Sequence, residues 1–188
     1  MFSDMLLGEV RDRFAHVDSC PKTGPRIFFE NAGGALTLKS AVETSTYYAA
    51  IPDNPGRDNE MAHDLVDTIN RAKANMRMFF NAPVGDIFVG ESGTELLFRL
   101  IMNAVLGAED GGVVLGSTLE HPATRSACTR WAKVAGKPYI QVAHNNVTGA
   151  VTAEDYKPYL TPDIRVATIL HTSPVTGMGV DVASVAAA

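Results

Sequence analysis

Short, mainly apolar runs alternate with helical patterns through the second half of this 188-residue chain. The runs at residues 86–90, 113–115, 139–143 and 165–170 read as strands. The helical patterns between and after them cover residues 96–105, 122–136 and 153–160. This alternation is typical of βαβ units on a parallel sheet, and the unbroken apolar strands indicate that helices cover both faces. We therefore predict a three-layer open α/β sheet.

The first half of the chain is predicted to be mainly helical. Apolar residues recur at helical spacing over residues 5–14, 38–50 and 61–80. Turn-forming residues interrupt these patterns at 20–25 and 52–56.

We divide the chain into an N-terminal helix and arm, residues 1–25, and an α/β domain, residues 26–188. The helical pattern at residues 180–188 stops without a glycine cap or a basic last turn. We therefore expect the domain to be the N-terminal part of a larger one, cut within a helix.

Charge and hydropathy exclude several classes of protein. The net charge is −5 and no basic stripe stands out, which argues against a nucleic-acid binder. No window approaches the roughly 18 unbroken apolar residues of a membrane span. The only apolar segment near the N-terminus, residues 5–7, is preceded by Asp4 and by no cationic residue, so we expect no secretory signal.

The two cysteines, Cys20 and Cys128, are far apart and lie in no metal-binding spacing. The histidines also lack a short ligand spacing, so we predict no metal site. A reducing, cytoplasmic environment is the expectation from this cysteine usage. Cys128 is expected to be buried and not nucleophilic.

Polar groups follow three of the predicted strands. They are GESGTE at residues 90–95, EHP at 120–122 and HTSP at 171–174. In a parallel sheet these segments share one edge, beyond the carboxyl ends of the strands, where ligands bind.

The turn at residues 90–95 has two interpretations. A small-residue turn before a helix offers free backbone N–H groups to a phosphate, with the Ser92 and Thr94 hydroxyls beside them. The spacing of Ser92 and Glu95 also fits an ordinary capping box. The turn matches neither GxGxxG nor the nucleotide-binding GxxxxGK[ST], which disfavours nucleotide cofactors.

His121 can stack on an aromatic ligand, act as acid or base, cap the following helix or be a structural histidine. The turn from Asn31 to Gly34 permits close approach of a ligand, and it is also consistent with a plain tight turn.

Taken together and in order, these segments resemble the class V aminotransferases. The segments are FENAGG at 29–34, NPGR at 54–57, ESGTE at 91–95, LEH at 119–121 and HTSPVTG at 171–177. That family comprises pyridoxal-phosphate enzymes of fold type I and includes the cysteine desulfurases. The resemblance runs from about residue 27 to residue 182.

The resemblance implies roles for individual residues. Gly93 and Thr94 match the turn that binds the cofactor phosphate, and His121 matches the histidine that stacks on the pyridine ring. Asn31 and Gly33 match the segment near the substrate.

Two departures from the family pattern stand out. Pro174 occupies a position where the family often has an Asn that contacts the cofactor or the substrate carboxylate, so Thr172 or Ser173 would have to make that contact. The Schiff-base lysine and the Asp that pairs with the pyridine nitrogen lie downstream in the family. No lysine of this chain stands in the Schiff-base context, so the catalytic residue is unknown and the chain alone is expected to be inactive.

The resemblance implies an enzyme that uses pyridoxal 5'-phosphate to transaminate or desulfurate a small amino acid. It also implies a homodimer for the full-length protein. The charge and hydropathy noted above predict neither a nucleic acid nor a membrane as partner. A lyase or epimerase of the same fold, and a non-catalytic fragment or binding module, are the alternatives.

Overall fold

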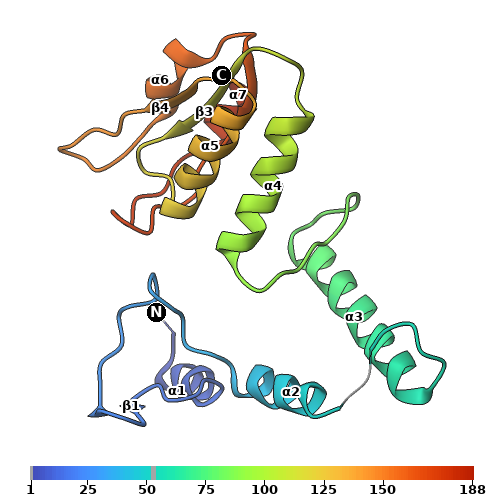
Figure 1. Ribbon diagram of the computed structural model, residues 1–188. Coiled ribbons are helices and arrows are strands. Elements are labelled where there is room, and N and C mark those ends of the chain that lie inside the picture. Colours follow the sequence, from blue (N-terminus) through green and yellow to red (C-terminus); the bar gives the residue numbers. More distant parts are fainter. Residues whose placement is uncertain (1, 52–53) are drawn as a thin grey trace. The chain divides into compact units, whose positions relative to one another are not determined.

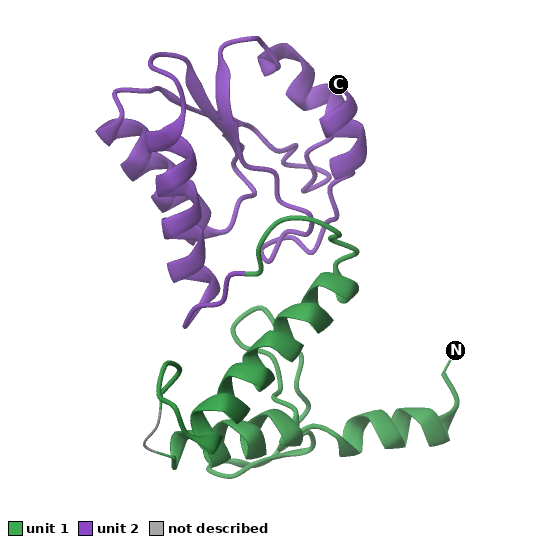
Figure 2. Cartoon of the chain, turned by 90° about the vertical axis from the view of Figure 1, so that its right-hand side faces the viewer, with its two compact units in different colours: residues 1–87 green, residues 88–188 purple. Residues whose placement is uncertain are grey.

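The computed structural model describes residues 2–51 and 54–188 of the chain. The chain forms two compact units, residues 1–87 and residues 88–188, coloured separately in Figure 2. Each unit is described by itself below. The predicted division of the chain at residue 25 stays a prediction.

The described residues of unit 1 form three helices and a small hairpin. The helices are α1 (Asp4–Asp12), α2 (Lys39–Ala49) and α3 (Glu60–Phe79), and the antiparallel hairpin pairs β1 (Ser19–Cys20) with β2 (Gly24–Pro25). The helices lie within two residues of the predicted ones. The starts of α1 and α3 carry local caps: Ser3 Oγ accepts a hydrogen bond from Leu6 N, and Asn59 Oδ1 accepts one from Ala62 N at 2.8 Å. The predicted break at 52–56 lies partly outside the described residues, at 52 and 53.

Unit 2 is built on a three-stranded parallel sheet. Its strands are β3 (Val113–Ser117), β4 (Tyr139–Val142) and β5 (Ile164–Ala167), in the order β4-β3-β5. Its helices are α4 (Gly93–Gly107), α5 (Pro122–Val134), α6 (Ala153–Tyr156) and α7 (Val182–Ala187), with a 3₁₀ turn at Lys157–Tyr159. The predicted strands at 113–115, 139–143 and 165–170 therefore form, with shifted ends.

Successive residues of β3 face two separate hydrophobic cores. Val114 packs with Ile101 and Val105 of α4 and with α5, whereas Leu115 packs with Tyr156 of α6 and Val185 of α7. Neighbouring side chains on a strand point to opposite faces of the sheet, so both faces are covered. Figure 2 shows helices on either side of the strands of unit 2. The predicted three-layer α/β architecture is confirmed.

One predicted strand is absent. Residues 86–90 form no strand, and the Phe88 and Val89 side chains remain 67% and 69% exposed. A strand requires a neighbour whose N–H and C=O groups it can pair with, and this run has no such neighbour among the described residues. Apolar composition alone therefore overstated the case for a strand.

The predicted helix at 153–160 is also shorter than expected. It becomes a four-residue α-helix followed by the 3₁₀ turn, because Pro158 has no N–H to donate to the carbonyl four residues earlier. Among the described residues, no helix combines the length and apolar character needed to cross a bilayer.

Candidate functional site

The candidate site lies at the carboxyl edge of the unit 2 sheet. Because β3 and β5 are parallel, the segments that follow Ser117 and Ala167 leave from the same edge. Helix α4 packs against α5, and Figure 1 shows both helices starting at the same, lower end of the unit. The three polar segments expected at one edge therefore belong to one end of unit 2, although the strand expected before the first of them does not form.

The first turn of α4 has backbone N–H donors without acceptors among the described residues. Ser92 is the N-cap, and its Oγ accepts a hydrogen bond from Glu95 N at 3.2 Å. The backbone N–H groups of Gly93 and Thr94 have no acceptor among the described residues, as expected for the first positions of a helix. Ser92 thus makes its half of the capping box, while two N–H groups stay available.

The space around this turn suits an incoming anion. A Cβ built on Gly93 would meet no atom within 4 Å, and the Thr94 side chain is exposed. The Glu95 carboxylate forms an ion pair with Arg99 one helical turn later, so its negative charge is compensated within the helix. The open glycine, the free N–H groups and the positive end of a 15-residue helix together fit a phosphate group.

His121 caps α5. Its Nδ1 accepts a hydrogen bond from Ala123 N at 3.1 Å, and the residue is half-buried. Because Nδ1 is the acceptor, the neutral ring carries its proton on Nε2, for which the described residues offer no acceptor. The helix-capping interpretation is confirmed, and it fixes the imidazole at the sheet edge without using its second nitrogen.

Glu120 links the two strand ends. Its side chain is only 3% exposed, and Oε1 accepts hydrogen bonds from Leu170 N at 2.9 Å and from Ser117 Oγ at 3.5 Å. Burial raises the pKa of Glu120 above its ordinary value, although both hydrogen bonds act in the opposite direction. The residue immediately before His121 therefore binds the segment that leads to Thr172.

The hydroxyl groups predicted to replace the family's Asn differ in availability. Ser173 is 2% exposed, and its Oγ accepts hydrogen bonds from Val175 N and Thr176 N, both at 3.2 Å. Thr172 is exposed, and its Oγ1 lies 3.0 Å from His171 Nδ1. Ser173 is thus occupied in holding the turn around Pro174, and Thr172 is the more accessible of the two.

Asn31 and Gly33 belong to unit 1. Gly33 N donates to Glu30 O at 3.1 Å, which closes a tight turn, and both residues are exposed. Their predicted substrate role stays a prediction.

The sequence by itself assigns no role to two residues of this edge. One is Glu120, whose position directly before a histidine at a strand end was its only signal. The other is His144, which follows β4: its Nδ1 lies 2.7 Å from Thr118 Oγ1, and its backbone N–H donates to the same oxygen at 2.9 Å. Both side chains join neighbouring strand ends, a property that depends on strand order.

Cys128 lies in the α5 core, as expected. It is fully buried, with its Sγ 3.8 Å from Thr168 Oγ1, and burial raises the pKa of the thiol. Within residues 2–51 and 54–188, no group of three or more His, Cys, Asp or Glu side chains is placed to hold a metal ion.

The fold and the edge define an α/β domain that presents a helix N-terminus and a fixed imidazole beyond the carboxyl ends of parallel strands. The chain belongs to the aminotransferase class-V family, whose model matches residues 27–188. The resemblance seen in the ordered sequence segments is thereby confirmed.

Individual relatives are cysteine desulfurase-like. The chain is 29% identical over 164 residues to the cysteine desulfurase-like protein ustD of Aspergillus flavus, covering 82% of this chain. The crystal structure of the Escherichia coli cysteine desulfurase CsdA matches all of this chain with a TM-score of 0.72 at 20% identity. A variant of C-DES with glycine covalently linked to its PLP cofactor matches 94% of the chain with a TM-score of 0.70 at 20% identity.

These structural matches confirm the fold predicted for the chain. The chain spans only 36% of the fungal relative, 46% of the CsdA chain and 44% of the C-DES chain.

Proposed function

We propose that this chain forms the phosphate- and ring-binding part of a pyridoxal-phosphate-dependent enzyme that acts on an amino acid. The observation that carries the proposal is the open first turn of α4, where the N–H groups of Gly93 and Thr94 lack acceptors and Gly93 faces free space. The family membership and the position of His121 at the same end of unit 2 support it.

Each of the chain's own residues then has a defined task. Gly93 and Thr94 bind the phosphate through backbone N–H groups and a hydroxyl, in a charge-assisted interaction. His121 packs its imidazole against the pyridine ring, and its Nε2–H can donate a hydrogen bond to the cofactor or the substrate. Glu120 positions His121 relative to the segment that contains Thr172. When bound, the cofactor supplies an electron sink for the carbanion at the substrate's α-carbon.

The positions of the chain's lysines suggest that none of them holds the cofactor. Lys137 is buried, and its Nζ donates to Glu109 O at 2.5 Å and to Gly111 O at 2.8 Å. The other lysines, which are Lys22, Lys39, Lys73, Lys133 and Lys157, are exposed. We propose that the lysine that holds the cofactor lies outside these 188 residues, in agreement with the share of the relatives that the chain covers.

Among the reactions open to such an enzyme, we favour cysteine desulfuration, because the relatives are named for it. Transamination is the second candidate, and a lyase or epimerase reaction the third. We further propose that the enzyme is a homodimer and is cytoplasmic, the latter from its cysteine usage. A clean monomer in sedimentation at micromolar concentration would contradict the dimer.

A non-catalytic binding module is the alternative from another class. Pro174 favours it, because a proline side chain offers no polar group at a position where the family often makes a contact. A module would bind the cofactor without ever attaching it to a lysine, in any length of the protein.

Borohydride reduction after equilibration with pyridoxal phosphate separates these possibilities. The 188-residue chain should bind the cofactor reversibly, and reduction should leave none attached. The longer protein that we propose contains this chain should retain one cofactor per chain after reduction. Absence of attachment in both would favour the module, and attachment within the 188-residue chain would overturn our assignment of the lysines.

Thr94→Ala tests the site itself. Loss of one charge-assisted hydrogen bond should weaken cofactor binding by about 1.5–3 kcal/mol, or roughly tenfold to hundredfold. Thr44→Ala, which alters an exposed threonine on α2, is the matched control and should leave the affinity unchanged.

A further inference from the structure

The outward face of α5 carries three cations without carboxylate partners. Arg125, Arg130 and Lys133 are exposed, and no Asp or Glu of the described residues forms a salt bridge with them. Six other cations of the chain pair with carboxylates; they are Arg11, Arg13, Arg77, Arg99, Lys157 and Arg165. Lys22, Lys39 and Lys73 of unit 1 form no salt bridge among the described residues either, but they come from separate elements, whereas the three α5 cations share one helix. Helix α5 itself contains no acidic residue, so a local charge of +3 stands on a chain whose net charge is −5.

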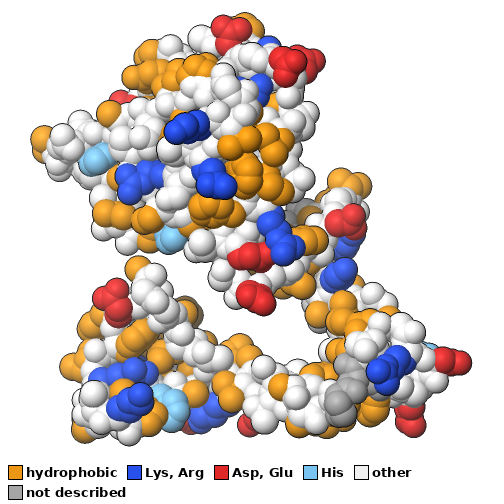
Figure 3. All heavy atoms as spheres, in the orientation of Figure 1, with side chains coloured by type: hydrophobic (Ala, Val, Ile, Leu, Met, Phe, Trp, Pro, Cys, Tyr) orange, Lys and Arg blue, Asp and Glu red, His pale blue; other side chains and the backbone are white. Residues whose placement is uncertain are grey.

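These cations border a groove of about 880 Å³, which we call the α5 groove. The Ser126 and Thr129 hydroxyls lie among them on the helix, and Gln141 of β4 contributes to the lining. Figure 3 shows Lys and Arg side chains gathered over α5, with no Asp or Glu between them in this view. The groove thus offers several cationic and hydroxyl donors in one row.

This row of cations is longer than the diameter of a single small anion. Arg125 and Lys133 are eight residues apart, which corresponds to about 12 Å along a helix. The Arg130 guanidinium between them lies 5.3 Å from the centre of the Trp131 ring, a contact that limits its freedom. Several negative groups in series match this spacing better than one phosphate does.

The groove also adjoins the candidate site. Pro122 lines one end of it and directly follows His121. A segment seated along α5 would therefore end next to the residue that we place against the cofactor ring.

We propose that the α5 groove is a docking site for an acidic segment of another protein. We favour an acidic polypeptide over a nucleic acid. The chain's net charge of −5 repels a long polyanion, whereas a short acidic segment interacts mainly with the cations within a Debye length of it. A symmetric contact between two α5 grooves is disfavoured, because it would place cation against cation.

The test uses a fluorescently labelled peptide of eight glutamates and measures its binding by anisotropy at low salt. The variant Arg125→Glu/Arg130→Glu/Lys133→Glu should bind about tenfold or more weakly, as expected from losing three exposed charge pairs. The matched control Lys22→Glu/Lys39→Glu/Lys73→Glu makes the same change in net charge on unit 1 and should lose less than about twofold.

Several results would overturn the proposal. They are no binding by the parent protein, equal losses in the two triple variants, and tighter binding of an eight-nucleotide single strand than of the peptide. A change in sedimentation that accompanies the α5 substitutions without a change in peptide affinity would assign the groove to self-association. If the charge-reversal variant does not fold by circular dichroism, Arg125→Gln/Arg130→Gln/Lys133→Gln replaces it, and a loss of less than about twofold would then reject the proposal.

Discussion

The Glu120 carboxylate accepts a hydrogen bond from the backbone N–H of Leu170 across 2.9 Å, joining two segments that lie 50 residues apart in the sequence. Both groups stand at the carboxyl edge of the sheet, one before His121 and the other before the segment with Thr172. The contact makes two loops of the candidate site into one connected element.

Replacing Glu120 with Ala should destabilise the protein by about 1–3 kcal/mol, because Leu170 N–H then loses its acceptor in a partly buried position. Glu120→Gln keeps an oxygen at Oε1 and should cost less. Urea unfolding of the three proteins measures both differences. Equal stability of the Ala and Gln variants would mean that the hydrogen bond contributes little.

The stability of the protein should depend on pH through Glu120. Burial raises the pKa of this carboxyl from its ordinary value of 4.5, so the folded state binds more protons than the unfolded state just above that pH. Stability relative to Glu120→Gln should therefore fall as the pH rises from about 4.5 through the folded-state pKa, and then level off. A difference that stays constant between pH 4 and pH 7 would contradict the raised pKa.

Substitution of Gly93 with Ala should separate ligand binding from stability. The new Cβ meets no protein atom within 4 Å, so stability should stay the same or rise slightly. The same Cβ enters the space assigned to the phosphate, and pyridoxal-phosphate affinity should drop about tenfold or more. Gly107→Ala, at the other end of α4 and also in open space, should leave the affinity intact. Equal cofactor affinities in Gly93→Ala and Gly107→Ala would contradict the assignment of the phosphate to this turn.

Two variants separate the observed helix-capping role of His121 from the role that we propose for it against the cofactor ring. His121→Ala removes both the cap and the ring, and should lose about 0.5–2 kcal/mol of stability. His121→Asn restores the cap, because an Asn side chain can accept the same hydrogen bond. Both should weaken cofactor binding by about 0.5–1.5 kcal/mol and shift the absorbance of the bound cofactor. Full cofactor affinity in His121→Asn would show that the histidine serves the helix alone.

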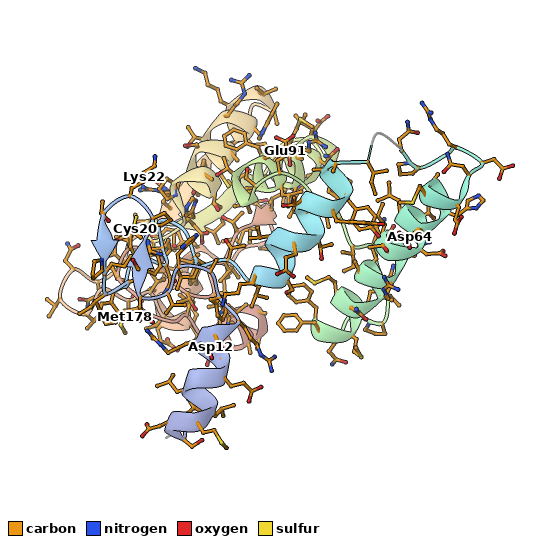
Figure 4. All side chains as sticks on the ribbon, turned by 90° about the horizontal axis from the view of Figure 1, so that it is seen from below. Asp12, Cys20, Lys22, Asp64, Glu91 and Met178 are labelled. Atoms are coloured by element: carbon orange, nitrogen blue, oxygen red, sulfur yellow. The ribbon has the colours of Figure 1, made fainter. Side chains whose placement is uncertain are left out.

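Cys20 should react faster with alkylating agents than Cys128. Figure 4 labels Cys20 and Lys22 on the β1–β2 hairpin, where hydrogen bonding by Thr23 lowers the pKa of the Cys20 thiol to about 7. About half of the thiol is thus ionised at neutral pH, whereas Cys128 is buried with a raised pKa. Thr23→Ala should raise the Cys20 pKa and slow its iodoacetamide labelling at pH 7 several-fold. Thr23→Ser keeps the hydroxyl and should preserve the labelling rate.

The local features of this chain could be predicted because they depend on neighbouring residues. Ser92, Asn59 and Pro122 begin helices through their own side chains or ring, so the starts of α4, α3 and α5 follow from sequence. The strands β3 to β5 followed from apolar runs, and the family followed from the order of its motifs.

Only the tertiary structure decided which neighbours these elements have. The run at 86–90 holds three adjacent apolar residues, as β3 does, yet it forms no strand, because a strand needs a partner whose position composition does not encode. Glu120 and His144 acquired their contacts in the same way, through the order β4-β3-β5, which brings together residues far apart along the chain. The sequence thus determined the family and the secondary elements other than the run at 86–90 and the end of the helix at 153–160, and the pairing of strands decided which polar side chains share the edge of the sheet.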